Sequence, residues 1–136
     1  MRLDQGLVDA AVSLAENRWP EGEGGAAAMY LEDGRVVTSV FAESPNGAAE
    51  LCHETGAICE AHKLNLAVTA SVCVSRETER DPFVILTPCG ICQERLAFWG
   101  RDVEVAIPDP EDATKWQTRR LYEVQPYYWR NIFDTE

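Results

Sequence analysis

The segment Thr87-Pro88-Cys89-Gly90-Ile91-Cys92 carries two cysteines three positions apart, directly after a proline. Proline suits the first turn of a helix and Gly100 suits a helix end, so a helix is predicted from residue 88 to about residue 99. Residues three apart in a first helical turn face the same way, and the amide dipole there favours thiolates, the form in which cysteine binds metals. The segment therefore predicts a pair of metal-binding sulfur atoms at a helix start.

A second group of reactive side chains lies upstream, at Cys52-His53-Glu54. Three thiolates on one zinc ion leave a fourth tetrahedral position open for water, which is typical of a catalytic rather than a closed structural site. Glu54, two residues past Cys52, can reach such a water without being a ligand, as a general acid and base must. Cys52, Cys89 and Cys92, with Glu54, thus indicate zinc-assisted catalysis.

Hydrophobic periodicity and turn residues predict helices and strands that alternate along the chain. Apolar residues recur at helical spacing over residues 5–17, and Asp33-Gly34 between strand-like runs at 26–31 and 35–41 indicates a hairpin. Further predicted elements are a helix at 48–64, strands at 66–74, 83–86 and 102–107, a break at 108–110 and a helix at 115–124. This order predicts a sheet covered by helices, antiparallel at the hairpin and otherwise mostly parallel.

Together, the two cysteine segments resemble the signature of the zinc-dependent cytidine deaminase superfamily, in which His or Cys, any residue and Glu are followed by Pro-Cys-x-x-Cys. The likeness is greatest to the small homotetrameric cytidine deaminases and the blasticidin S deaminases. It implies an α/β fold, three-layer α/β/α, with a five-stranded mixed sheet and an N-terminal antiparallel hairpin, in one domain over residues 1–136. It also implies that Cys52, Cys89 and Cys92 bind one Zn²⁺ per chain and that Glu54 shuttles protons.

The resemblance further implies a reaction and a set of substrate contacts. The reaction is hydrolytic deamination of a free pyrimidine nucleoside (cytidine, deoxycytidine or a modified cytidine) to the uridine-type product and ammonia. The backbone carbonyl of Thr87 would face the departing amino group, and Trp129 occupies the position of a pocket-lining aromatic. Phe41 stands where the family has a ribose-binding asparagine, Glu43 retains the family's glutamate, and His53 replaces an alanine. We expect these three to line the pocket, which leaves a blasticidin S deaminase-like or modified-base aminohydrolase as an alternative.

Plainer interpretations of these residues stay open. A closed structural zinc site would need Cys59 or Cys73 as its fourth ligand. Cys59 lies two helical turns past Cys52, which is about 10 Å along the helix axis and too far for one tetrahedral site. Cys73 falls in a predicted strand, which is typical of a cysteine in the core. A redox pair would leave Glu54 without a role, and His53 as a metal ligand would leave Cys52 without one. A non-catalytic zinc-binding scaffold is the alternative from another functional class.

Composition limits the class of protein. The chain has 136 residues, of which 46% are hydrophobic and 26% charged, as expected for one globular domain. Its net charge of −11 disfavours nucleic-acid binding, which depends on Lys and Arg contacts to phosphates. No apolar run approaches the roughly 20 residues of a membrane span and no signal peptide is evident, so we expect a cytoplasmic protein without a membrane partner. The resemblance implies a homotetramer, to which an aromatic tail gives weak support: Tyr127, Tyr128, Trp129 and Phe133.

Overall fold

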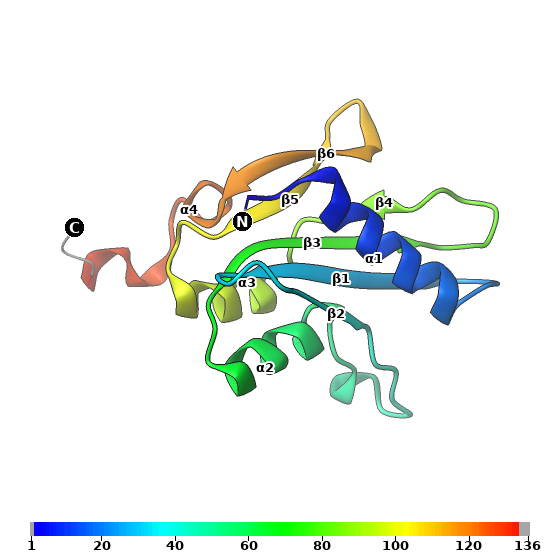
Figure 1. Ribbon diagram of the computed structural model, residues 1–136, viewed down its shortest axis with the longest axis horizontal. Coiled ribbons are helices and arrows are strands. Elements are labelled where there is room, and N and C mark those ends of the chain that lie inside the picture. The colour runs from blue at the N-terminus through cyan, green and yellow to red at the C-terminus, as the bar shows by residue number, and fades with distance from the viewer. Residues whose placement is uncertain (1, 134–136) are drawn as a thin grey trace.

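A six-stranded mixed sheet forms the middle of the molecule (Figure 1), in a computed structural model that describes residues 2–133. The strands are β1 (Gly24–Leu31), β2 (Val36–Val40), β3 (Val68–Arg76), β4 (Val84–Ile85), β5 (Glu104–Asp109) and β6 (Asp112–Arg120). Five of them are hydrogen-bonded in the order β2-β1-β3-β5-β6, and the short β4 pairs with the end of β3. The predicted mixed sheet with an N-terminal hairpin is confirmed. β4 falls within the strand predicted at residues 83–86, and β6 is the sixth strand, which was not predicted.

Antiparallel pairs dominate this sheet, so the prediction that it is mostly parallel beyond the hairpin is wrong. β1 pairs antiparallel with both β2 and β3, and β5 pairs antiparallel with β6. Among the described strands only β3 and β5 pair in parallel. The reason is that β1 lies between β2 and β3, so those two strands run in the same direction without being neighbours.

Helices cover both faces of the sheet, which confirms the three-layer α/β/α arrangement (Figure 1). The helical segments are α1 (Gln5–Arg18), α2 (Thr55–Leu64), α3 (Gly90–Leu96) and α4 (Leu121–Val124), with the short 3₁₀ turns η1 (Gly47–Ala49), η2 (Ala97–Trp99) and η3 (Trp129–Phe133). Leu7 and Ala11 of α1 pack in a core with Val72, whereas Ile58 and Leu96 of α2 and α3 pack on the opposite face. Within residues 2–133, no helix is both long and apolar enough to cross a membrane.

The prediction of a helix over residues 115–124 is wrong, because most of this stretch belongs to β6 and only its end forms α4. Its backbone pairs with β5 from Glu104 opposite Arg120 to Pro108 opposite Trp116. The Trp116 ring packs against the core beneath α1, and its Nε1 donates to Gln5 Oε1 at 2.7 Å. Strand pairing and this packing override the local preference for helix. Residues 108 and 109, predicted as part of a break, accordingly continue β5.

The two helices that follow the cysteine segments begin later than predicted. Within the predicted helix 48–64, Leu51 pairs with Ala42 through two backbone hydrogen bonds of 3.0 and 3.2 Å, so that α2 starts only after Glu54. Similarly, α3 starts after Cys89, whose backbone is extended and forms the N-cap. These late starts leave Cys52, Glu54 and Cys89 at the entrances of the helices.

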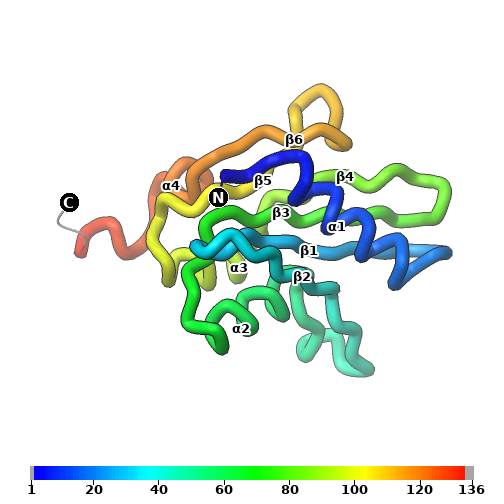
Figure 2. Tube along the Cα trace, in the orientation of Figure 1, coloured from blue at the N-terminus to red at the C-terminus, as the bar shows by residue number. Residues whose placement is uncertain are grey.

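The loop between β3 and β4 is tied to the connection between α1 and β1, at the same end of the molecule (Figure 2). The amide of Gly22 donates to Glu79 at 3.0 Å. The Arg76 guanidinium donates to the backbone carbonyl oxygens of Trp19 and Gly22, at 2.6 and 3.2 Å. These contacts fix the position of Trp19 at the end of α1.

Candidate active site

Three cysteine sulfur atoms converge where the segments before α2 and α3 meet. The Sγ atoms of Cys52, Cys89 and Cys92 lie within 4.8 Å of one another, with 3.5 Å between those of Cys52 and Cys89. All five cysteines are free thiols. Within the described chain, neither Cys59 nor Cys73 joins the group, so no fourth sulfur completes it. The geometry is that of a three-sulfur donor set.

Burial and the amides at the start of α3 shift the pKa values of these thiols in opposite directions. Burial by itself would raise the pKa of Cys89, but hydrogen bonds from the amides of Cys92 and Ile91 and from the Cys52 thiol lower it. Burial raises the pKa of both Cys52 and Cys92, and the charge of Glu54 adds to that effect at each. A bound cation is therefore needed if all three sulfurs are to be thiolates together.

Glu54 is a buried carboxyl beside the three sulfurs. It is only 3% exposed, and its backbone carbonyl accepts a hydrogen bond of 3.0 Å from Ile58 in the first turn of α2. Burial raises the pKa of Glu54. Hydrogen bonds from the thiols of Cys92 and Cys73 lower it in part, as does the charge of Arg95. A carboxyl that keeps its proton to a higher pH than usual is suited to proton transfer near neutral pH.

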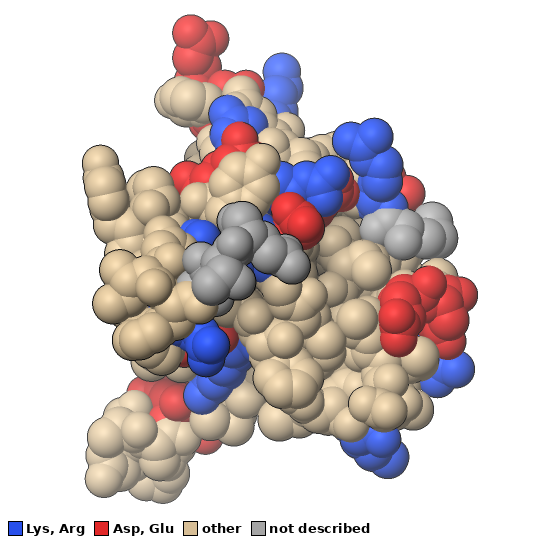
Figure 3. All heavy atoms as spheres, turned by 90° about the vertical axis from the view of Figure 1, so that its left-hand side faces the viewer, with Lys and Arg blue, Asp and Glu red and all other residues tan. Residues whose placement is uncertain are grey.

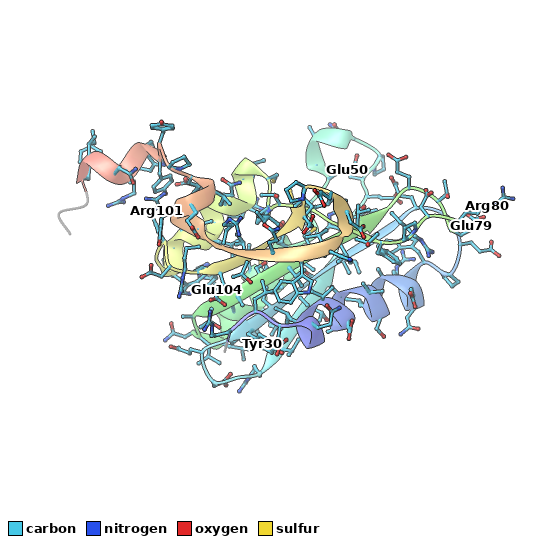
Figure 4. The ribbon with its side chains drawn as sticks, turned by 90° about the horizontal axis from the view of Figure 1, so that it is seen from above. Tyr30, Glu50, Glu79, Arg80, Arg101 and Glu104 are labelled. Atoms are coloured by element: carbon cyan, nitrogen blue, oxygen red, sulfur yellow. The ribbon has the colours of Figure 1, made fainter. Side chains whose placement is uncertain are left out.

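A pocket of about 440 Å³ opens onto this group, which is a volume that suits a small molecule. Four of the five residues predicted to contact substrate line it: Phe41, Glu43, His53 and Thr87. The lining also contains the carboxylates of Glu23 and Glu50, and no lysine or arginine of the described chain. Figure 4 shows Glu50 on the loop that carries η1. The pocket is therefore strongly negative.

Trp129, the fifth residue predicted to contact substrate, lies outside this pocket in its own chain. Its Nε1 donates to the carboxylate of Glu94 on α3 at 3.1 Å, and the hydroxyl of Tyr128 donates to the same carboxylate at 3.1 Å. Trp129 borders a larger hollow of about 1180 Å³ between α3 and the C-terminal segment, which no cysteine lines. Its pocket role stays a prediction that requires a neighbouring subunit.

Aromatic rings form one wall of the pocket. The Phe41 ring is stacked on Trp19, with ring centroids 4.5 Å apart and planes at 7° to each other. On its other contact, the centroids of the Phe41 and His53 rings are 5.1 Å apart. The His53 ring packs against Gly25, where a Cβ atom would lie 2.2 Å from Nε2. Burial lowers the pKa of His53, and its Nε2 is buried without a hydrogen-bond partner in the described chain.

Sequence reasoning did not identify Cys73 or Trp19 as residues of the site. Cys73 lines the pocket from β3, where it lies opposite Ala27 of β1, while its neighbours in β3 pack into the core under α1. Side chains alternate between the two faces of a strand. Once the face of the sheet that α2 and α3 cover is known to carry the other cysteines, this alternation places Cys73 on that face too. Trp19 reaches the pocket wall only by stacking on Phe41, for which the sequence carries no signal.

No protein-family model and no curated protein matches the chain. Among solved structures, a cytidine deaminase from Bacillus anthracis is 45% identical, with a TM-score of 0.88 over 95% of this chain and 91% of that one. A cytidine deaminase from Mycobacterium tuberculosis is 26% identical, with a TM-score of 0.66 over 94% of this chain and 98% of that one.

A third structure, a cytidine deaminase from Burkholderia pseudomallei, is 18% identical with a TM-score of 0.72, and covers 94% of this chain and 100% of its own. At that identity it supports the fold alone. The first structure is similar enough in sequence, over nearly the full length of both chains, to establish kinship. The chain therefore belongs to the cytidine deaminase superfamily and is a hydrolytic enzyme.

Proposed function

We propose that this enzyme catalyses the zinc-dependent hydrolytic deamination of a free amino-substituted pyrimidine nucleoside, with cytidine or deoxycytidine as substrate. One observation carries the proposal: three cysteine sulfur atoms converge beside one buried carboxyl, Glu54, on a pocket of small-molecule size. The 45% identity to a protein named as a cytidine deaminase supports nucleoside deamination as the reaction.

The donor atoms fit a zinc ion. Three sulfurs within 4.8 Å of one another suit tetrahedral Zn²⁺, and three protein ligands leave one position for water. Cys52, Cys89 and Cys92 would hold the ion, one per chain. The chemistry that zinc supplies at such a site is activation of a water molecule toward loss of a proton near neutral pH. Glu54 lies beside the sulfurs without being needed as a ligand.

Glu54 would carry out the proton transfers. Its carboxylate takes one proton from the water as the oxygen bonds to the amino-bearing ring carbon, and it delivers that proton to the adjacent ring nitrogen. It then takes the second proton from the same oxygen and delivers it to the amino group, which leaves as ammonia while the ring keeps a carbonyl. Because burial raises the pKa of Glu54, the carboxyl can both accept and return protons near neutral pH.

The substrate contacts expected from the sequence complete the proposal. The backbone carbonyl of Thr87 would accept a hydrogen bond from the amino group. Phe41 and His53 would offer an aromatic surface on the sugar side, where Glu43 would accept a hydrogen bond from a hydroxyl. Trp129 would reach the pocket of a neighbouring subunit in a homotetramer.

The decisive experiment replaces Glu54 with glutamine, which keeps the size of the side chain and removes its proton transfer. The Glu54→Gln protein should keep one zinc per chain and lose turnover by about 10²-fold or more. Glu60→Gln is the matched control, because Glu60 is an exposed residue of α2 outside the pocket lining, and it should keep both zinc and turnover. Unchanged turnover in Glu54→Gln would refute the role assigned to this carboxyl.

A substrate panel separates the remaining alternatives. Ammonia release is measured with cytidine, deoxycytidine, cytosine, blasticidin S and ring-substituted cytidines, and the proposal expects the highest kcat/KM for an unmodified nucleoside. The solved structures similar to this chain are cytidine deaminases and do not favour the blasticidin S alternative. A preference for blasticidin S or for a modified base would replace the proposal by that alternative. Zinc-loaded protein that releases no ammonia from any of these compounds would instead indicate a non-catalytic scaffold.

A further inference from the structure

We propose that a second divalent cation of the zinc type binds beside the three-cysteine site and inhibits the enzyme. Its ligands are a ring nitrogen of His53, a carboxylate oxygen of Glu54 and the Sγ of Cys73, which lie within 4.8 Å of one another. No residue of this group belongs to the three-cysteine group. Binding at this second site is independent of the proposed function, whereas the inhibition rests on it.

The donor atoms determine which kind of ion the second site takes. One imidazole nitrogen, one carboxylate oxygen and one sulfur form a set typical of Zn²⁺, whereas Mg²⁺ and Ca²⁺ take oxygen ligands. Bonds of about 2.0–2.3 Å to one zinc ion place its ligand atoms less than about 4 Å from each other. The three ligand atoms here lie within 4.8 Å of one another, so small side-chain rotations bring them to that spacing. The set therefore favours zinc over the abundant hard cations.

His53 supplies an independent observation that points to a ligand. Its Nε2 is buried and has no hydrogen-bond partner within residues 2–133. The ring is held between Phe41, at a centroid distance of 5.1 Å, and Gly25, where no side chain fits. Buried polar atoms in proteins are nearly always partnered, so an unpartnered Nε2, on a ring that brings a nitrogen within 4.8 Å of Glu54 and Cys73, indicates a place for a ligand.

Cys73 and Glu54 can exchange their mutual contact for a metal ion. Cys73 is 4% exposed and its thiol donates a hydrogen bond to the Glu54 carboxylate. When Zn²⁺ binds the sulfur, the thiol proton leaves to solvent, and the carboxylate gains a bond to the metal in place of that hydrogen bond. A carboxylate bound in this way cannot take a proton from water, so the bound ion blocks the proposed catalytic step.

The pocket gives a cation access to this site. His53, Glu54 and Cys73 all line it. Glu23, Glu43 and Glu50 line it as well, and none of these carboxylates forms an ion pair within the described chain. A cleft lined by negative charge raises the local concentration of divalent cations.

Titration of the one-zinc holoenzyme with Zn²⁺ tests the proposal. Bound zinc is measured by equilibrium dialysis with elemental analysis, and deamination is measured at the same free Zn²⁺ concentrations. The wild type should take up a second equivalent while activity falls by tenfold or more in parallel. A weak chelator should then restore activity while one equivalent stays bound. Uptake of a single equivalent over the whole titration would overturn the proposal.

Two variants identify the ligands. His53→Ala and Cys73→Ser should each keep the first equivalent, which also reports that the chain is folded, and should weaken the second by at least tenfold. The matched controls Cys59→Ser and His62→Ala, at an exposed cysteine and histidine of α2, should bind both equivalents as the wild type does. Unchanged affinity for the second equivalent in both ligand variants would exclude this site. Wild type that binds no first equivalent would instead contradict the proposed function.

Discussion

At the scale of single residues, Gly25 decides whether His53 can occupy the pocket wall. A Cβ at this position would lie 2.2 Å from His53 Nε2 and 2.9 Å from the backbone oxygen of Val74. Gly25→Ala must therefore displace the imidazole or bend β1, and it should lower the free energy of unfolding by about 1–3 kcal/mol, as measured by urea denaturation. Gly90→Ala is the control, because nothing lies within 4 Å of its added Cβ, and it should cost no stability. Equal stability of the two variants would contradict the packing described for His53.

Residues that carry the chemistry differ in how far the sequence predicts them. Cys89 and Cys92 stand in one short segment, and Cys52 and Glu54 in another, so local spacing alone suffices to group each pair. That the two pairs meet depends on the fold, which the resemblance supplied. Cys73 enters the site through strand pairing, and no spacing along the chain reports that contact.

At the scale of elements, Glu79 joins the β3–β4 loop to the connection between α1 and β1. Figure 4 shows it at one end of the molecule, with Arg101 at the other end. Its own amide and that of Gly22 donate to the carboxylate and lower its pKa. A lowered pKa means that the folded chain binds fewer protons than the unfolded chain. This contribution to stability is therefore present above the unfolded-state pKa and is lost as pH falls through the folded-state pKa.

Glu79→Gln should accordingly lower the melting temperature slightly near neutral pH, and the difference from wild type should vanish in strong acid. Melting curves of both proteins across the acidic range check this. Glu77→Gln, at an exposed position of the same loop, is the control and should follow the wild type at every pH. A difference for Glu79→Gln that does not depend on pH would show that the carboxylate charge is not the cause.

The elements predicted correctly are those whose signals are local. The periodicity of α1 and the Asp33-Gly34 turn of the β1–β2 hairpin each need only a few neighbouring residues. By contrast, β6 is an edge strand that exists because β5 pairs with it, and the late start of α2 reflects the pairing of Leu51 with Ala42. Both errors arise where a distant backbone decides the local conformation.

A metal ion at the three sulfurs would join the segment before α2 to the start of α3. Anything that binds only the folded chain stabilises it, by about 4 kcal/mol when its free concentration is a thousand times its dissociation constant. A strong chelator should therefore lower the free energy of unfolding by several kcal/mol, and Cys89→Ala should reproduce the loss. Cys59→Ser, at an exposed cysteine outside the group, should not. Denaturation curves that coincide with and without chelator would contradict a zinc site that links these elements.

At the scale of the whole molecule, large apolar side chains are exposed at the end that carries the C-terminal segment. Residues other than Lys, Arg, Asp and Glu make up much of that face in Figure 3, with charged residues scattered among them. The exposed fractions are 97% for Tyr127, 83% for Ile132, 70% for Phe98, 63% for Phe133 and 59% for Trp129. Monomeric proteins rarely leave so many large apolar side chains exposed together. This surface supports the proposal that subunits associate there.

Association through this surface would place Phe98 and Ile132 between subunits. An aspartate at either position would be buried without a partner, at a cost that favours the separated chains. Light scattering should give the wild type about four times the 15.2 kDa of one chain, and Phe98→Asp and Ile132→Asp a lower mass. Ser13→Asp adds the same charge at an exposed position of α1, on the other side of the sheet, and should leave the mass unchanged. A wild type that scatters as a single chain would refute the tetramer, and with it the role proposed for Trp129 in a neighbouring pocket.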